Sequence, residues 1–537
     1  MGAIVKQYDK RIGVTYAYES TSYWNKDKKQ SRAKRKLIGI VDPETGEIKP
    51  TTRKKRSTRK PATSPGETDP WLFAQRTFYG ATYLFDCIGD ATGVAEDLKK
   101  CFPQTYSQIL SIAYYLIMED KNPLSRFPRW SSLHRHPYGQ TISSQQSSEL
   151  FAEITESQRM HFFRLQGRRR LEKEYCAYDT TSISSYSESL RQVRYGKNKD
   201  GDSLPQINLA LLFGDESNLP FYYRKLPGNI PDVSTVKRLL DDMGFLGCKM
   251  IKLVLDRGFY SESNVNALYS EHLKFLMGAK LSLKFVSSEL EKARGDVRLW
   301  QNFLPDAEAF GVTVPIQWKY RRKRPYKHDE VQEERRMYVH IYFDTLKALE
   351  DERNFATLIY RLHGELMTGN REKGHEMLYE KYFDIKSTPV RGQKVMAKED
   401  VMADARKNFG FFVLIGNEAV DAGRALLTYR NRDMVEKAFD NVKDRLDMRR
   451  LNVSSDLSLD GKLFVEFIAL IFISYLHKAM LRAHLYTKYT MHELLDELEV
   501  IERFDRQGCA PQLGEITEKQ SDIFKALNFE PPNSSLC

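Results

Sequence analysis

The sequence predicts an α/β protein of several domains, with a mixed-sheet core interrupted by an insertion. The chain of 537 residues is too long for one ordinary hydrophobic core. Within residues 171–281, strand-like segments are followed by alternating helices and strands, which is typical of an α/β core. This pattern is lost over residues 282–408 and resumes over residues 409–480, where the apolar segment FGFFVLIGN opens the second part of the core.

The composition indicates a folded and basic protein. Hydrophobic residues make up 41% of the chain and aromatic residues 12%, which excludes wholesale disorder. The net charge of +11 indicates a polyanionic partner, most often nucleic acid, although a basic but otherwise ordinary protein remains the alternative. Six cysteines lack any paired spacing, which argues against a zinc site or a disulfide framework and suits a reducing compartment.

The first 170 residues predict two different parts. Residues 1–70 combine strand-like segments with two basic clusters, KKQSRAKRK and TRKKRSTRK, and form a strand-rich segment and a flexible arm. Residues 71–170 carry apolar residues at helical spacing and are expected to form a small helical domain. Its position in the chain and its basic end favour a DNA-binding domain, although it contains no clear helix-turn-helix spacing. Its His134 and His136 are expected at the surface.

The end of the chain predicts a buried helix and a helical tail. The segment LFVEFIALIFISYL, residues 463–476, is strongly apolar, but it is short for a bilayer and contains Glu466. A buried core helix is therefore expected. Residues 481–537 are predicted to form a C-terminal helical region, and the start of the chain lacks the apolar stretch of a signal peptide.

Three acidic residues are the candidate functional residues. Asp179 lies in the apolar segment CAYDTTS, and Asp256 ends the apolar strand MIKLVLD. Ligand sites in α/β sheets collect at the carboxyl ends of strands. The third acid, Glu436, lies in the segment RNRDMVEKAF. Taken singly, an Asp at the end of a strand is more often a turn or cap residue than a catalytic residue, and a lone Glu on a helix is more often simply exposed to solvent.

The segment LLTYRNRDMVEKAFDNVKDRL, residues 426–446, is predicted to be one helix with a polar stripe. It holds Tyr429, Arg432, Glu436 and Lys443 at separations of three, four and seven residues. With 3.6 residues per turn, these side chains fall within a sector of roughly 60°. The stripe is either a solvated face or a set of groups directed at one ligand.

Converging carboxylates indicate bound cations, because like charges repel strongly where water is excluded. Magnesium and manganese prefer such oxygen ligands. Two ions about 3.5 to 4 Å apart can activate a nucleophile and stabilise a leaving oxygen in phosphoryl transfer. The sequence has no Ser-His or Cys-His motif for covalent catalysis, which agrees with this interpretation.

The motif Y-x2-R-x3-E-x6-K resembles the large insertion-sequence group of bacterial DDE transposases. CAYDTTS and LVLDRGFYSESN resemble the segments that carry the first and second Asp of that group. The resemblance spans about residues 174–480, and the layout is similar to the long-chain branch.

The resemblance implies a ribonuclease H-like core in which Asp179, Asp256 and Glu436 bind two Mg²⁺ or Mn²⁺ ions. It implies hydrolytic nicking at the ends of an element, followed by attack of the 3′-hydroxyl on target DNA. Tyr429, Arg432 and Lys443 would contact phosphates near the cut.

The resemblance also suggests further DNA contacts. A tryptophan in the insertion of this family stacks on a flipped base, for which Trp300 and Trp318 are candidates, and a core position is the alternative for both. The other candidate DNA-binding residues are basic: Arg257, Arg321, Arg322, Lys323 and Arg324.

The expected partners are double-stranded DNA, as terminal inverted repeats and as target, and a second copy in a homodimer on DNA. No membrane is expected, and the location would be the bacterial cytoplasm, at the nucleoid. One alternative is a metal-dependent nuclease without strand joining. Another is a DNA-binding relic without catalysis, which the presence of all three acids disfavours.

Overall fold

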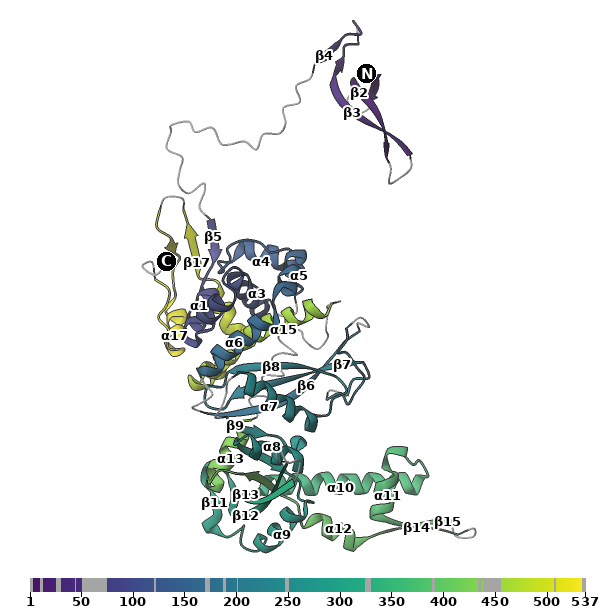
Figure 1. Cartoon of the computed structure of the whole chain (residues 1–537), viewed down its shortest axis with the longest axis vertical. Helices are drawn as coiled ribbons and strands as arrows, with labels where there is room; N and C mark the ends of the chain where they lie inside the picture. The colour runs from purple at the N-terminus through teal and green to yellow at the C-terminus, as the bar shows by residue number, and fades with distance from the viewer. Residues whose placement is uncertain are drawn as a thin grey trace. The chain divides into compact units, whose positions relative to one another are not determined.

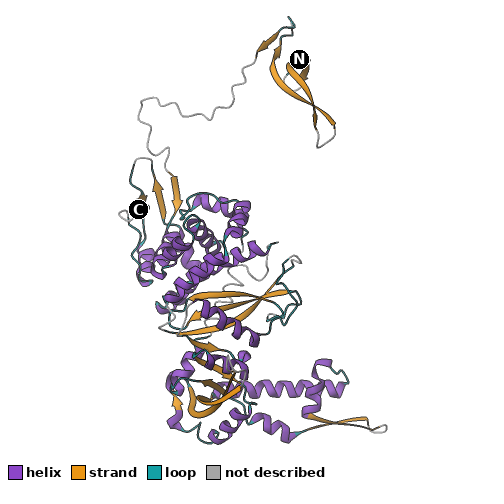
Figure 2. Cartoon of the chain, in the orientation of Figure 1, coloured by secondary structure: helices purple, strands orange, loops and turns teal. Residues whose placement is uncertain are grey.

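The structure is a computed structural model of the chain, which divides into two units, Met1–Leu72 and Phe73–Cys537 (Figures 1 and 2). The described residues run from 3 to 533. The gaps among them are 10–12, 26–29, 44, 51–74, 120–121, 170–173, 187–189, 200, 247–250, 324–329, 389–391, 433–436, 438–454 and 507–508.

The first unit contains an antiparallel four-stranded sheet with the strands in sequence order. Its strands are β1 (Ala3–Asp9), β2 (Val14–Asn25), β3 (Gln30–Val41) and β4 (Ile48–Pro50). The first basic cluster lies largely on β3, where Arg35 pairs in register with Ser20 of β2. The second cluster lies outside the described residues.

Helices from both ends of the second unit pack into one layer of the fold. The helices before the main sheet are α1 (Gly80–Thr92), α2 (Val94–Cys101), α3 (Tyr106–Met118), α4 (Phe127–Leu133), α5 (Ser144–Glu153) and α6 (Glu156–Arg168). Those after it are α15 (Asp456–Arg482), α16 (Met491–Glu499) and α17 (Glu518–Ala526). A small sheet joins the two groups, because β5 (Gln75–Phe78) pairs with β17 (Glu502–Asp505), which pairs with β18 (Gln512–Leu513).

The apolar helix α15 is the centre of this helical layer. Its length and composition would suit a membrane span, but 78% of its apolar stretch is buried inside the fold. Phe472 packs edge-on against Tyr114 of α3 and Phe85 of α1, and Phe464 packs against Phe102. The prediction of a buried core helix at residues 463–476 is confirmed.

The expectation of surface positions for His134 and His136 is wrong. Both are buried, and the His134 ring stacks on Trp130 with centroids 4.7 Å apart. The Nε2 atom of His134 lies 2.5 Å from a carboxylate oxygen of Glu499, and Nδ1 of His136 bonds to Ser111 at 2.9 Å. Aromatic stacking and polar partners make burial favourable, and the polar partners Ser111 and Glu499 lie too far away in the sequence for a local pattern to reveal them.

A nine-stranded mixed sheet lies at the centre of the remaining part of the second unit and confirms the predicted α/β class. Its strand order is β11-β12-β13-β16-β10-β9-β6-β7-β8. β9 is parallel to both β6 and β10, and the other neighbours are antiparallel. The strands are β6 (Tyr175–Ser184), β7 (Gln206–Gly214), β8 (Pro220–Pro227), β9 (Lys252–Leu255), β10 (Lys274–Ala279), β11 (Phe303–Leu304), β12 (Ala309–Lys323), β13 (Glu330–Phe343) and β16 (Phe411–Gly416).

Short elements connect these strands. The α-helices are α7 (Thr235–Leu246), α8 (Glu262–Ser270), α9 (Lys284–Ala293) and α13 (Ala422–Arg430). Among the described residues, the 3₁₀ turns are η2 (Leu124–Arg126), η3 (Asp232–Ser234), η4 (Arg257–Phe259), η5 (Trp300–Asn302), η6 (Pro305–Ala307), η7 (Lys373–His375) and η9 (Leu485–Thr487).

The predicted insertion, residues 282–408, contains two kinds of structure. β11, β12 and β13 are strands of the main sheet. After β13, a separate part with its own apolar cluster extends away from the sheet (Figure 1). It consists of α10 (Thr345–Thr368), α11 (Glu376–Tyr382), β14 (Phe383–Thr388), β15 (Gly392–Ala397) and α12 (Glu399–Arg406).

The predicted single helix over residues 426–446 is interrupted. α13 ends at Arg430, and Asn431 and Arg432 form a turn. Asn431 has φ −60° and ψ −18°, so the backbone is still right-handed where the helix ends. The rest of the predicted helix, apart from Lys437, lies outside the described residues.

Candidate active site

Two adjacent parallel strands place Asp179 and Asp256 side by side. Tyr178 of β6 pairs in register with Leu255, the last residue of β9, and an Asp follows each of them. Neighbouring strands lie about 4.8 Å apart, so the two aspartates occupy adjacent positions at one point of the sheet. The apolar residues before each Asp are buried strand residues, which fixes both carboxylates on rigid backbone.

Asp179 is a largely buried carboxyl. Burial raises its pKa, and the neighbouring Asp256 carboxylate acts in the same direction. Lys199, Arg432 and the backbone N–H of Thr180, which donates to Oδ1 at 2.7 Å, oppose this rise. A carboxylate that is costly to desolvate therefore depends on nearby positive charge.

Asp256 is more accessible, with 41% of its side chain exposed. It forms the N-cap of η4, and its Oδ1 accepts a hydrogen bond of 3.0 Å from the hydroxyl of Tyr429. Burial and the Asp256 charge both raise the pKa of Tyr429. The phenol therefore keeps its proton at neutral pH and remains a donor to Asp256.

Gly278 of β10 allows these groups to approach. A Cβ atom at this position would lie 2.8 Å from the Tyr429 hydroxyl oxygen and 2.9 Å from the backbone nitrogen of Arg257. Both distances are shorter than real Cβ contacts, so α13 and η4 can close on β10 only because this residue is a glycine. The sequence analysis did not identify Gly278, which sits unmarked in the strand FLMGAK.

The guanidinium of Arg432 lies between the two aspartates. One of its nitrogens, Nη1, is 3.8 Å from Oδ2 of Asp179 and 3.6 Å from Oδ1 of Asp256. Its central carbon lies 5.3 Å from the centroid of the Tyr429 ring. Two residues of the predicted polar stripe thus meet both aspartates, although they are separated from Asp179 by about 250 positions in the sequence.

A second cation, Lys199, contacts Asp179 and a third acid, Asp232. Its Nζ lies 3.5 Å from Oδ1 of Asp179 and 3.3 Å from Oδ2 of Asp232, at the start of η3. It also donates to Thr180, whose hydroxyl donates to Asp232 at 2.5 Å. Lys199 and Asp232 could not be identified from the sequence, because neither belongs to an apolar strand or to the motif.

The remaining predicted residues are placed as follows. Glu436, Lys443 and Arg324 lie outside the described residues, as do the side chains of Arg322 and Lys323 at the end of β12. Arg257 of η4 and Arg321 of β12 are exposed.

The two candidate tryptophans have different environments. Trp318 is buried, packs edge-on against Phe285 and donates its indole N–H to Asn266 at 2.9 Å. This is the core position that the sequence left open as the alternative. Trp300 is 79% exposed, which makes it the more accessible of the two rings.

The two aspartates fit a divalent cation. Their oxygens face one guanidinium nitrogen, so the structure already holds positive charge between them. Aspartate oxygens are the ligand type that Mg²⁺ and Mn²⁺ prefer. Such an ion would stabilise the charged form of Asp179, which burial disfavours.

A cavity of about 580 Å³ opens beside Asp256 and Tyr429. Its other wall comes from the part beyond β13, including Asn354 and Phe355 of α10 and Phe409. The candidate active site therefore adjoins a partly aromatic space between the main sheet and α10.

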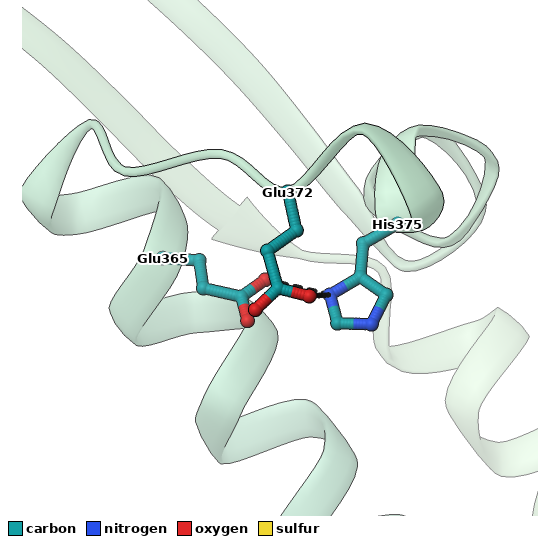
Figure 3. Close-up of side chains that lie close together, drawn as sticks. All are labelled: Glu365, Glu372 and His375. Atoms are coloured by element: carbon teal, nitrogen blue, oxygen red, sulfur yellow. Dashed lines mark hydrogen bonds and ion pairs between the residues drawn. The ribbon is translucent and has the colours of Figure 1, made fainter.

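A different group of possible metal ligands occurs in the described part of the chain, at Glu365, Glu372 and His375 (Figure 3). Hydrogen bonds from Tyr379 and His375 lower the pKa of Glu365 to about 2. Arg361 pairs with both glutamates, at 2.8 and 2.5 Å. These contacts satisfy the carboxylates within the protein, so the group serves to fasten η7 and α11 to α10.

The central part of the chain matches a known protein family. Residues 170–472, more than half of the chain, match the family described as Transposase DDE domain. No curated protein sequence matches the chain. Among solved structures, one match is a piggyBac transposase in a synaptic complex with hairpin DNA, with 9% identity, a TM-score of 0.31 and 61% of this chain covered. The chain spans about half of that protein, 51% of its length.

Proposed function

Because the chain belongs to the family of DDE transposases, we propose that it binds the ends of an insertion element, cleaves them by metal-dependent hydrolysis and joins the 3′-hydroxyl ends to target DNA. The observation that carries this proposal is the adjacency of Asp179 and Asp256 on parallel strands, with Arg432 of the motif between them. All three residues lie within the segment that matches the family.

The proposed architecture follows from the sheet and the motif. We propose that β6 to β10 form the ribonuclease H-like core expected from the resemblance to the bacterial insertion-sequence group. The interrupting domain would be the part beyond β13, residues 344–410, which is narrower than the predicted 282–408. The helical layer around α15 would bind the element ends, and its α6 adds basic residues such as Arg164.

We propose that Asp179, Asp256 and Glu436 hold two Mg²⁺ or Mn²⁺ ions. When bound, such ions activate the attacking oxygen and stabilise the leaving oxygen of a phosphodiester. Asp179 is held in place by its strand and by the Thr180 N–H, whereas the accessible Asp256 is oriented by the Tyr429 hydroxyl. Lys199 and Arg432 would have to move from the carboxylates, or share them, as the ions enter.

Cationic groups released from the carboxylates are suited to the DNA backbone. A guanidinium binds a phosphate through two parallel hydrogen bonds, so Arg432 would exchange the aspartates for a phosphate near the cut. Lys443 would add a contact on the same segment. The exposed Arg257 and Arg321, with Arg322, Lys323 and Arg324, would follow the backbone further from the cut.

The proposed partners are the terminal inverted repeats, the target DNA and a second copy of the chain in a homodimer on DNA. The proposed location is the bacterial cytoplasm, at the nucleoid. Two element ends must be cut and joined together, and two copies of the site would serve this need.

The test uses the purified chain, Mg²⁺ and DNA that carries the inverted repeats flanking the gene. We expect nicking at the repeat end, followed by covalent joining to a target plasmid. Asp256→Asn should reduce both products by at least about a thousandfold, since a ligand and its charge are lost, while binding to the repeat persists. Asp404→Asn, which changes an exposed acid of α12, is the matched control and should give nicked and joined products at the wild-type level.

A metal-dependent nuclease is the rival function. It would give nicked products from the same DNA without joined products at any Mg²⁺ or Mn²⁺ concentration. A non-catalytic relic would bind the repeat and give neither product.

A further inference from the structure

The helix α10 presents large apolar side chains to solvent on the side away from its packed face. Its buried residues include Phe355, Leu362 and Leu366. Four other residues, Leu346, Leu349, Tyr360 and Met367, are 73, 61, 83 and 60% exposed. Exposed apolar side chains that gather on one face of a helix often mark an interaction site.

These exposed residues form a regular stripe. Leu346, Leu349, Arg353, Ala356, Tyr360, His363 and Met367 follow one another at steps of three and four. With 3.6 residues per turn they fall within a sector of roughly 100°, on the helix side roughly opposite Leu362. The stripe runs for about 32 Å along the axis, at 1.5 Å per residue. Such spacing is the geometry of a helix that packs against another helix.

The order of residues along the stripe is self-complementary. An antiparallel copy centred between Ala356 and Thr357 places Leu346 opposite Met367, and Arg353 opposite Tyr360. The first pair is apolar and the second is suited to a cation–π contact.

Polar character and size also match in the same register. The flanking Glu350 then faces His363, both exposed, and Leu349 faces Gly364, which leaves room for it. A two-fold interface requires this kind of reciprocity, because each residue must suit its partner in both directions.

We propose that the exposed stripe of α10 is a homodimer interface, in which α10 pairs antiparallel with α10 of a second copy. DNA does not suit this surface, because the stripe has one arginine and no lysine among seven positions, and phosphate binding requires several cations. A pair of single helices is smaller than the about 800 Å² per partner of a standard interface, so the free protein should dimerise weakly.

The antiparallel orientation of the two α10 helices can be tested by cysteine cross-linking of the full chain. Ala356→Cys sits at the two-fold axis and should form a disulfide-linked dimer on mild oxidation. Tyr360→Cys alone should cross-link poorly, whereas a mixture of Tyr360→Cys and Arg353→Cys should cross-link well. The controls are the wild-type chain, which has an exposed Cys509, and Thr368→Cys, an exposed position of α10 away from the axis.

Sedimentation over about 1 to 100 μM protein tests whether the exposed stripe of α10 mediates dimerisation. The wild type should show a concentration-dependent dimer, and Leu349→Glu with Tyr360→Glu should weaken it at least about tenfold. Val500→Glu, at an exposed apolar position of the helical layer, should leave the dimer affinity unchanged. Far-ultraviolet circular dichroism checks that each variant is folded.

The proposal is overturned if the wild type stays monomeric, or if the double variant dimerises as the wild type does. Equal cross-linking by Tyr360→Cys alone and by Ala356→Cys would overturn the antiparallel arrangement. None of these measurements uses metal or DNA, so they are independent of catalysis. The Asp256→Asn chain should dimerise normally even if it cleaves nothing.

Discussion

Replacing Lys199 by Met should make the candidate active site bind divalent cations more tightly. The Nζ atom lies 3.5 Å from Asp179 and 3.3 Å from Asp232, so an entering ion competes with a cation that is already in place. Methionine keeps the length of the side chain and removes the charge.

The size of the expected gain in metal affinity follows from Coulomb's law at these distances between Lys199 and the two carboxylates. Two unit charges 3.5 Å apart attract by about 5 kcal/mol at an effective dielectric constant of 20, and by about 1 kcal/mol in bulk water. Lys199 is 36% exposed, so solvent screens the pair, and a net effect of about 1 to 2 kcal/mol is expected. This corresponds to roughly a tenfold rise in affinity for Mg²⁺ or Mn²⁺ at neutral pH.

Thermal melting and calorimetry with added metal measure this effect. Without metal, the Lys199→Met chain should melt at a lower temperature than the wild type, because the buried Asp179 loses a counter-charge. With Mg²⁺ or Mn²⁺, it should gain more stability than the wild type does. Lys225→Met is the matched control, since Lys225 pairs with Asp460 away from the site.

An unchanged or weaker affinity for Mg²⁺ in the Lys199→Met chain would refute the competition between Lys199 and the metal. A response of the Lys225→Met chain equal to that of Lys199→Met would show a general charge effect instead.

Three further predictions concern the fold and the site. Burial raises the pKa of Asp86 to about 6, so its contribution to stability is present below about pH 4 and is lost as the pH rises through 6. Asp86→Asn should therefore raise the free energy of unfolding at pH 7 by up to about 3 kcal/mol and flatten its slope between pH 4 and 6, which denaturant titrations with the exposed Asp404→Asn as control can measure; an unaltered slope would contradict the assignment. Gly278→Ala should displace the Tyr429 hydroxyl and lower stability by about 1 to 3 kcal/mol, whereas Gly295→Ala, where a Cβ meets nothing, should have little effect on the melting temperature. Phe472→Ala should lower the free energy of unfolding by about 3 to 5 kcal/mol, because it leaves a cavity between α15, α1 and α3; a loss below 1 kcal/mol would show that α15 is not the centre of this core.

The parts of the fold that follow local patterns could be predicted from the sequence. The alternation of strands and helices indicated the mixed α/β sheet, and the apolar run around Phe472 indicated a buried helix. Asp179 and Asp256 stood out because each interrupts or ends an apolar strand, where a carboxylate requires a reason. These signals lie within about ten residues of sequence, which is the range over which periodicity can be read.

Contacts between distant segments could not be predicted in this way. The pairing of β5 with β17 joins residues more than 400 positions apart, and no local pattern marks either strand as a partner of the other. Lys199 reaches Asp179 from the connection between β6 and β7, where a lone lysine looks like any solvated residue. The same holds for the contact of the buried His134 with Glu499, which lies 365 positions away in the sequence.

The charge balance at the two aspartates connects the fold with the proposed chemistry. Adjacent strands force Asp179 and Asp256 together, and their mutual repulsion would destabilise the sheet without a counter-charge. Lys199 and Arg432 come from segments on different sides of the site, and each contacts Asp179 through a different oxygen. Neither cation is part of the sheet, so both can leave without loss of a strand. A site held together by removable cations is suited to exchange them for metal ions and for the phosphates of a bound DNA end.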